Sequence, residues 1–178
     1  METLRLLLRR FSPSDSQALY EYLSDEQVVR FEPYDVHTLE ECEQAALRRS
    51  TNDAFWAICL KDTGSLIGNL YFSQQPYDTW ELGYVLGIAW QGNGYVTEAA
   101  LAMLQHAFKI LHAHRVIAMC NPENTPSWRL LERIGMRREG HLKQNIWFKR
   151  DGNGQPIWQD TYEYAILRSD WESMQSAK

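Results

Sequence analysis

The pattern of hydrophobic and polar positions predicts a chain in which strands and helices are mixed. Short apolar runs bounded by turn residues are typical of strands, and apolar residues at three- and four-residue spacing are typical of amphipathic helices. The predicted strands span residues 4–11, 55–60, 66–73, 79–86, 115–120, 136–148 and 157–167. One predicted helix follows the turn at 12–15, and the others span 39–49, begin near 97 and span 127–134.

Turn residues indicate how the strands are connected. The segments 61–65 and 151–154 have the composition of hairpin turns. The strands between 55 and 86 therefore form an antiparallel meander. The strand 115–120 follows a long helix and must return beside strand 79–86, which makes one β-α-β crossover. We predict an α+β fold with a mixed, mostly antiparallel twisted sheet flanked by helices.

Composition limits the class of protein. The chain has 178 residues, of which 44% are hydrophobic and 23% charged, so we predict one domain over residues 1–178. A net charge of −5 argues against a nucleic-acid surface. Cys42, Cys59 and Cys120 form no CxxC pair and indicate neither a disulfide framework nor a zinc site. Neither a signal segment nor a membrane-spanning run is recognised, so we expect a cytoplasmic protein with no membrane partner.

The segment Glu81–Ala99 reads as a strand, a glycine-rich loop and the start of a helix. Gly92 and Gly94 can take positive φ and let the main chain approach a ligand closely. At the start of the helix, backbone N–H groups lack intrahelical partners and the helix dipole favours an anion. The segment therefore favours a phosphate ligand, although a glycine pair between a strand and a helix is also typical of an ordinary turn.

Two familiar phosphate-binding motifs do not fit this loop. A P-loop requires Lys and then Ser or Thr after its second glycine, but Gly94 is followed by Tyr95 and Val96. A dinucleotide-binding fingerprint requires a glycine or alanine where the chain has Thr97. It also requires an acidic residue about twenty positions further on, near His114, where none stands.

The stretch Trp90–Ala99 resembles the acyl-CoA loop of the GCN5-related N-acetyltransferase (GNAT) superfamily. That loop begins with Gln or Arg and continues x-x-Gly-x-Gly/Ala, and the chain departs from it at Val96, where Gly or Ala is usual. The whole stretch is similar to the ribosomal-protein N-acetyltransferase branch of the superfamily. The resemblance implies that the crossover carries an acyl-CoA loop. The implied acetyl-CoA ligands are Gln91, Gly92, Asn93, Gly94, Tyr95 and Val96.

The segment Asn124–Gly140 resembles the same branch. It has the Asn-x-x-Ser motif of that branch, and then Glu-Arg-Ile-Gly-Met where Glu-Lys-x-Gly-Phe is usual. Taken alone, Asn124 and Ser127 could be simple helix-capping residues. The segment lies one strand beyond the loop, where the family has it, and the first strand and residues 158–167 also resemble the family. The resemblance therefore covers nearly the whole chain.

The resemblance implies residues for acyl transfer, which needs a neutral amine, a stabilised oxyanion and a proton for the departing thiolate. Glu81 is the candidate base, directly or through a water, although it could be a plain solvated carboxylate. Ser127 is the candidate acid, with Tyr162 and Tyr164 as competing hydroxyls. The pantetheine of acetyl-CoA is expected at Val85, Leu86 and Gly87. Asn124 is expected to contact the pantetheine or an ordered water, and Ser127 is also expected to contact acetyl-CoA.

The implied activity is transfer of an acetyl group from acetyl-CoA to a primary amine by direct attack in a ternary complex. The branch favours a protein N-terminal amine, such as that of a ribosomal protein. A small amine (an aminoglycoside, a polyamine or an amino acid) is the alternative acceptor, and a non-catalytic acyl-CoA-binding module is the alternative outside enzymes. We expect no metal, because His112 and His114 have no third ligand at suitable spacing. The oligomeric state stays open, with a homodimer as one arrangement.

Overall fold

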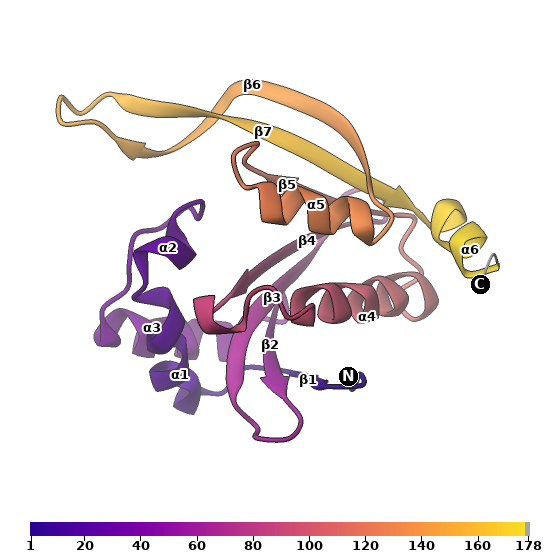
Figure 1. The fold of residues 1–178 in the computed structure, drawn as a ribbon, viewed down its shortest axis with the longest axis horizontal. Helices are drawn as coiled ribbons and strands as arrows, with labels where there is room; N and C mark the ends of the chain where they lie inside the picture. The colour runs from indigo at the N-terminus through magenta and orange to yellow at the C-terminus, as the bar shows by residue number, and fades with distance from the viewer. Residues whose placement is uncertain (177–178) are drawn as a thin grey trace. The chain divides into compact units, whose positions relative to one another are not determined.

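The computed structural model describes residues 1–176, which form a mixed α+β fold (Figure 1). The strands are β1 (Leu6–Arg9), β2 (Phe55–Leu60), β3 (Leu66–Gln75), β4 (Thr79–Leu86), β5 (Arg115–Cys120), β6 (Arg137–Arg150) and β7 (Pro156–Leu167). The α-helices are α1 (Ser16–Leu23), α2 (Glu26–Val29), α3 (Leu39–Ser50), α4 (Tyr95–Lys109), α5 (Thr125–Arg133) and α6 (Arg168–Ser176). Two short 3₁₀ turns are η1 (Pro13–Asp15) and η2 (Ile88–Trp90).

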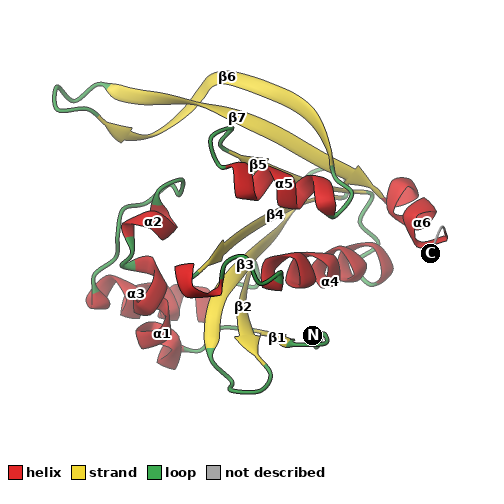
Figure 2. Ribbon diagram, in the orientation of Figure 1, coloured by secondary structure: helices red, strands yellow, loops and turns green. Residues whose placement is uncertain are grey.

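Seven strands form one sheet in the order β1-β2-β3-β4-β5-β7-β6 (Figure 2). β2 pairs antiparallel with β1 and with β3, and β7 pairs antiparallel with β5 and with β6. β4 and β5 run parallel, in register from Thr79 opposite Arg115 to Glu81 opposite Ile117. Because α4 connects these two parallel strands, the predicted β-α-β crossover and the mostly antiparallel sheet are both confirmed.

The chain divides into two compact units. The first contains Met1–Arg30, Asp35–Ser73 and Leu82–Met103. The second contains Phe31–Tyr34, Gln74–Glu81 and the chain from Leu104 onward. β4 and α4 therefore contribute residues to both units. The prediction of one domain over residues 1–178 stays a prediction.

In the first unit, α1 and α3 pack against each other, and a buried polar network ties them to the sheet. The Tyr22 hydroxyl of α1 donates to Asn69 Oδ1 of β3 over 2.9 Å, and Arg49 of α3 donates to the same oxygen over 3.1 Å. The Arg49 side chain is buried, and its guanidinium lies 4.9 Å from the ring centre of Phe55. A buried charge is costly unless its donors are satisfied, so this network fixes both helices on β3.

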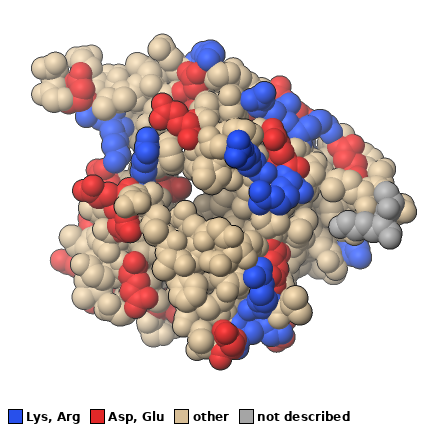
Figure 3. Space-filling view, viewed as in Figure 1, with Lys and Arg blue, Asp and Glu red and all other residues tan. Residues whose placement is uncertain are grey.

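In the second unit, α5 packs on β5 and β6, and α6 packs on β7. Ion pairs join β5 to β6 and β6 to α6: Arg115 contacts Glu139 at 2.6 Å, and Arg137 contacts Glu139 at 2.8 Å and also Asp170 of α6. On the face drawn in Figure 3, Lys and Arg side chains stand among Asp and Glu side chains. Arg115 and Arg137 are thus paired with carboxylates of the same unit.

Candidate functional site

The loop before α4 has a preset main-chain conformation. Gly92 and Gly94 have φ of +77° and +78°, in the left-handed region that side-chain-bearing residues avoid. The Gln91 side chain donates to the Leu86 carbonyl over 3.0 Å, and Glu98 N–H donates to the Gly94 carbonyl over 3.0 Å. The helix thus begins directly after the second glycine, and its first N–H groups have no carbonyl within the helix to bond.

The side chains of Asn93 and Val96 are held in place by the loop and by the core, respectively. Asn93 Nδ2 donates to the carbonyls of Trp90 and Gln91 over 3.2 and 3.1 Å. Val96 is buried, so the side chain that departs from the family pattern packs in the core. A Cβ added at Gly92 would meet nothing within 4 Å. The loop therefore offers an open position lined by main chain, which fits an anionic phosphate group.

The end of β4 leads into this loop. Val85 and Leu86 are buried, and Gly87 N–H donates to the Ile67 carbonyl of β3 over 3.0 Å. The parallel pairing of β4 with β5 ends at Glu81 opposite Ile117. Residues 82–86 of β4 therefore continue beyond the last pair that β4 forms with β5.

Glu81 lies in the second unit, at the last β4 position that is paired with β5. Its carboxylate is half-buried, and Gln75 Nε2 donates to Oε2 over 3.1 Å. Burial raises the pKa of the Glu81 carboxyl above its ordinary value, because desolvation disfavours the charged form. A carboxylate with a raised pKa is a stronger base, which is the property that deprotonation of an amine requires.

Asn124 and Ser127 lie together at the start of α5, also in the second unit. Asn124 is the N-cap, and its Oδ1 accepts from Ser127 N–H over 3.3 Å. The Ser127 hydroxyl is hydrogen-bonded to the Cys120 thiol at the end of β5. Burial raises the pKa of Cys120 to about 11, although this hydrogen bond opposes the rise. The thiol is therefore neutral near pH 7, and Ser127 has a neutral neighbour.

The two tyrosines that compete with Ser127 differ in their surroundings. Tyr164 is buried, and its hydroxyl donates to Glu132 Oε1 over 3.0 Å. Burial, with that carboxylate, raises the pKa of Tyr164 to about 12. Tyr162 is partly exposed and lies opposite Cys120 in the β5–β7 pairing, with the Arg138 guanidinium 4.4 Å from its ring centre. Tyr164 is therefore held in a structural contact, whereas Tyr162 is the alternative to Ser127 as the general acid.

The predicted site residues fall into two groups. Val85–Gly87 and Gln91–Val96 lie in the first unit, where the Gln91 side chain binds the end of β4 to the loop. Glu81, Asn124 and Ser127 lie in the second unit. Sequence reasoning missed the Cys120 contact of Ser127, because nothing in the residue pattern indicates which side chain faces a helix N-terminus.

A family model described as the acetyltransferase (GNAT) domain matches residues 5–137. The uncharacterized N-acetyltransferase YnaD of Bacillus subtilis is 41% identical over 171 residues, which cover 95% of this chain and 97% of YnaD. The chain belongs to the GNAT acetyltransferase family. A GNAT acetyltransferase structure from Bacillus anthracis matches with a TM-score of 0.87 and 38% identity over 95% of this chain and 98% of that chain.

A more distant relative of this GNAT acetyltransferase is the [ribosomal protein uS5]-alanine N-acetyltransferase of Escherichia coli. It is 33% identical over 113 residues, which cover 62% of this chain and 55% of that enzyme. The family uses acetyl-CoA as acetyl donor, and the protein is an acetyl-CoA-dependent N-acetyltransferase. Among the described residues, no helix of the acetyltransferase is long and apolar enough to cross a membrane.

Proposed function

We propose that the acetyltransferase modifies a protein N-terminal amine of the ribosomal-protein type, by direct attack in a ternary complex. The observation that carries the assignment of its site is the loop at the start of α4, where Gly92 and Gly94 hold left-handed conformations. The similarity to the ribosomal-protein uS5-alanine acetyltransferase supports the acceptor class. The Gln91 N–H already donates to the Ile88 carbonyl over 3.1 Å, so in this proposal the N–H groups of residues 92–96 bind the pyrophosphate of acetyl-CoA. Val85–Gly87 with Asn124 contact its pantetheine.

Each step of the reaction has a residue in the proposed mechanism. Glu81 takes a proton from the ammonium form of the acceptor, directly or through a water, and leaves a neutral amine. The amine nitrogen bonds to the thioester carbonyl carbon and loses a second proton to solvent, and collapse of the oxyanion breaks the C–S bond. Ser127 donates its hydroxyl proton to the departing sulfur and is reprotonated by solvent. The products are an N-acetyl amide, CoA and one proton.

The acceptor class is tested by a labelling experiment. The protein and labelled acetyl-CoA are incubated with whole-cell extract, and labelled protein is separated from labelled small molecules. We expect label in protein, at an N-terminal residue that peptide mass spectrometry identifies, and little label with a Glu81→Gln preparation. Label confined to small molecules would instead assign a polyamine, aminoglycoside or amino-acid acceptor. Binding of acetyl-CoA without any label transfer would indicate a non-catalytic acyl-CoA-binding module.

The role of Ser127 predicts a moderate and pH-independent defect. Ser127→Ala is expected to lower kcat about tenfold, because the thiolate of a thiol with a pKa of about 8.5 is already a fair leaving group. Thiolate departure does not depend on ionisation of the amine, so the ratio of wild-type to variant kcat stays constant with pH. The check is kcat across pH for Ser127→Ala beside Tyr162→Phe. A tenfold loss in Tyr162→Phe with none in Ser127→Ala would transfer the acid role to Tyr162.

A further inference from the structure

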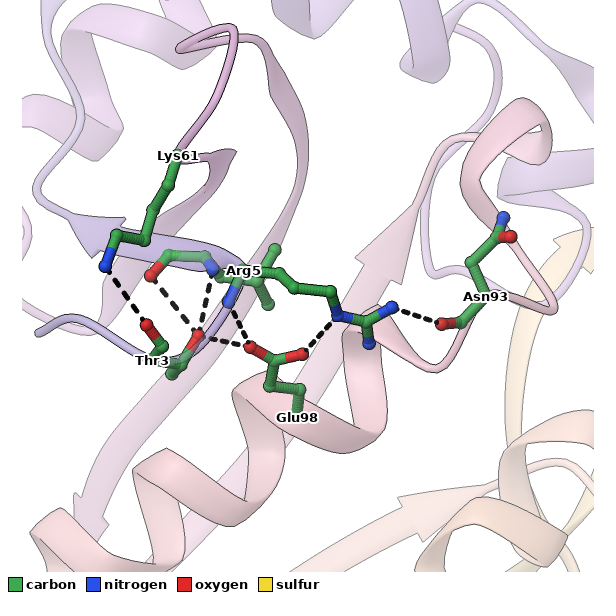
Figure 4. Close-up of polar contacts among 6 residues, drawn as sticks. Thr3, Arg5, Lys61, Asn93 and Glu98 are labelled. Atoms are coloured by element: carbon green, nitrogen blue, oxygen red, sulfur yellow. Dashed lines mark hydrogen bonds and ion pairs between the residues drawn. The ribbon is translucent and has the colours of Figure 1, made fainter.

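Arg5, just before β1, contacts the loop from a distant part of the sequence, within the first unit (Figure 4). Its Nη1 donates to the Asn93 carbonyl over 3.0 Å, and its Nε donates to Glu98 Oε2 over 2.7 Å. Its guanidinium carbon lies 4.5 Å from the ring centre of Tyr95, the first residue of α4. One side chain therefore contacts a loop carbonyl, the first helical residue and a carboxylate of the first helical turn.

Glu98 also accepts hydrogen bonds from the segment that precedes β1. Glu98 Oε1 accepts from the Thr3 hydroxyl over 2.6 Å and from Arg5 N–H over 2.7 Å. Lys61 extends the network by donating to the Thr3 carbonyl over 3.2 Å. The Glu98 side chain is 18% exposed and that of Arg5 is 43% exposed. Because donors from Thr3 and Arg5 bond both oxygens of the Glu98 carboxylate, the segment before β1 is fastened to the first turn of α4.

The contact between Arg5 and the Asn93 carbonyl fixes the direction in which the Gly94 N–H group points. No cis peptide bond occurs in the described chain, so the Asn93–Gly94 peptide is trans. In a planar trans peptide, the C=O and the N–H point in opposite directions. Because Arg5 holds the Asn93 carbonyl, the Gly94 N–H must point to the other side of the loop. A reversed peptide would present a carbonyl oxygen to an anion and repel it.

We propose that Arg5 and Glu98 form a clamp that fixes the Asn93–Gly94 peptide with its N–H directed toward the pyrophosphate of acetyl-CoA. This inference rests on the proposed function, because it assumes that the loop is the pyrophosphate site. Arg5 is a positioning residue in this scheme. Its positive charge is paired with Glu98, and its hydrogen bonds orient the loop.

Charge and orientation make opposite predictions for Glu98. If charge near the loop governed affinity, Glu98→Gln would remove a negative charge and tighten the binding of acetyl-CoA. In the clamp, Glu98→Gln loses the ion pair that aims Arg5, so binding weakens. We expect about a tenfold higher Kd for acetyl-CoA in Glu98→Gln and in Arg5→Gln. Arg5→Lys is expected to weaken binding as well, because an ammonium cannot reproduce the two-pronged contact of a guanidinium.

The test measures Kd by calorimetry, and kcat and KM with acetyl-CoA and with S-acetylpantetheine, which lacks the pyrophosphate. In the clamp variants KM for acetyl-CoA rises, kcat at saturation stays within about twofold, and kcat/KM for S-acetylpantetheine is unchanged. Arg48→Gln, on the exposed side of α3, is the matched control for loss of one positive charge and is expected to bind as wild type. General damage to the fold would lower activity with both donors.

Three results would overturn the clamp. They are tighter or unchanged binding in Glu98→Gln, full affinity in Arg5→Lys, and equal losses with acetyl-CoA and S-acetylpantetheine. Failure of the proposed site is a separate outcome. In that case the Gly94→Asp variant would bind CoA as tightly as the wild type. The loop would then not be the pyrophosphate site, and the role proposed for Arg5 would lapse with it.

Discussion

Glu81→Gln is expected to lower kcat by about 10²-fold or more near neutral pH, the effect typical of losing a general base. The amide has nearly the shape of the carboxylate and can keep the hydrogen bond with Gln75, but it accepts no proton from the amine. Affinity for acetyl-CoA is expected to stay near that of the wild type, because Glu81 is assigned to the amine. The loss should therefore be confined to kcat and to kcat/KM for the acceptor.

The direction of the pH dependence follows from the raised pKa of Glu81. The wild type loses its base as pH falls through that pKa, so its kcat/KM rises with pH over this range. The variant relies on solvent to deprotonate the amine, which becomes easier at high pH. The gap between the two therefore widens as pH rises through the pKa of Glu81 and narrows again at high pH, where the amine loses its proton to solvent. If both proteins follow the same profile at every pH, Glu81 is an ordinary strand residue and the base lies elsewhere.

The same pKa shift predicts that Glu81→Gln does not unfold the protein. The folded pKa is raised above the unfolded value, so the stability that protonated Glu81 contributes is present at low pH and is lost as pH rises through the folded pKa. Gln is neutral at every pH and avoids the cost of burying a charge near pH 7. Thermal unfolding of the variant at pH 7 should occur at or above the wild-type temperature. Glu43→Gln, on the exposed face of α3, is the control for kcat.

Gly94→Asp is expected to weaken acetyl-CoA binding by about 10²-fold or more, which corresponds to about 3 kcal/mol. The added Cβ fits, since it would meet only Arg5 Nη2 at 3.5 Å. The cost comes from a φ of +78°, which disfavours a side chain and would shift the main chain that binds the pyrophosphate, and from a negative charge introduced into the loop. The measurement is calorimetric titration of acetyl-CoA into the folded variant.

Gly64→Asp is the matched control for that experiment. Gly64 lies between β2 and β3 with a φ of +74°, and a Cβ there would meet nothing within 4 Å. The control introduces the same side chain at a nearly identical backbone conformation. It should therefore lose a similar amount of stability and keep its affinity for acetyl-CoA. Undiminished affinity in Gly94→Asp would mean that the loop is an ordinary turn.

The elements with strong local patterns were predictable from the sequence. The strands predicted at 55–60, 79–86 and 115–120 have the same bounds in the structure, because each is an apolar run bounded by turn residues. Helix α3 begins at Leu39 as expected, and Thr38 forms a capping box with Glu41. The loop could also be placed at a helix N-terminus, because two glycines stood between a strand pattern and a helix pattern.

Other features could not be read from local pattern. Helix α2 has four residues, too few to establish a period, and α6 has mostly polar residues with Trp171 buried. Arg5 is bonded to Glu98, which is 93 positions away, and a single charged residue beside a strand carries no sign of its partner. Position in the sequence also did not show that Tyr164 is buried against Glu132 whereas Tyr162 is partly exposed.

The most direct test of the proposed site is a crystal structure of the protein with acetyl-CoA. The proposal predicts pyrophosphate oxygens within about 3.2 Å of main-chain nitrogens of residues 92–96, with the Asn93 carbonyl still bonded to Arg5. It also predicts the thioester carbonyl carbon within reach of an amine that Glu81 can deprotonate. A pyrophosphate bound away from the start of α4, or an Asn93 carbonyl turned toward it, would contradict the proposal.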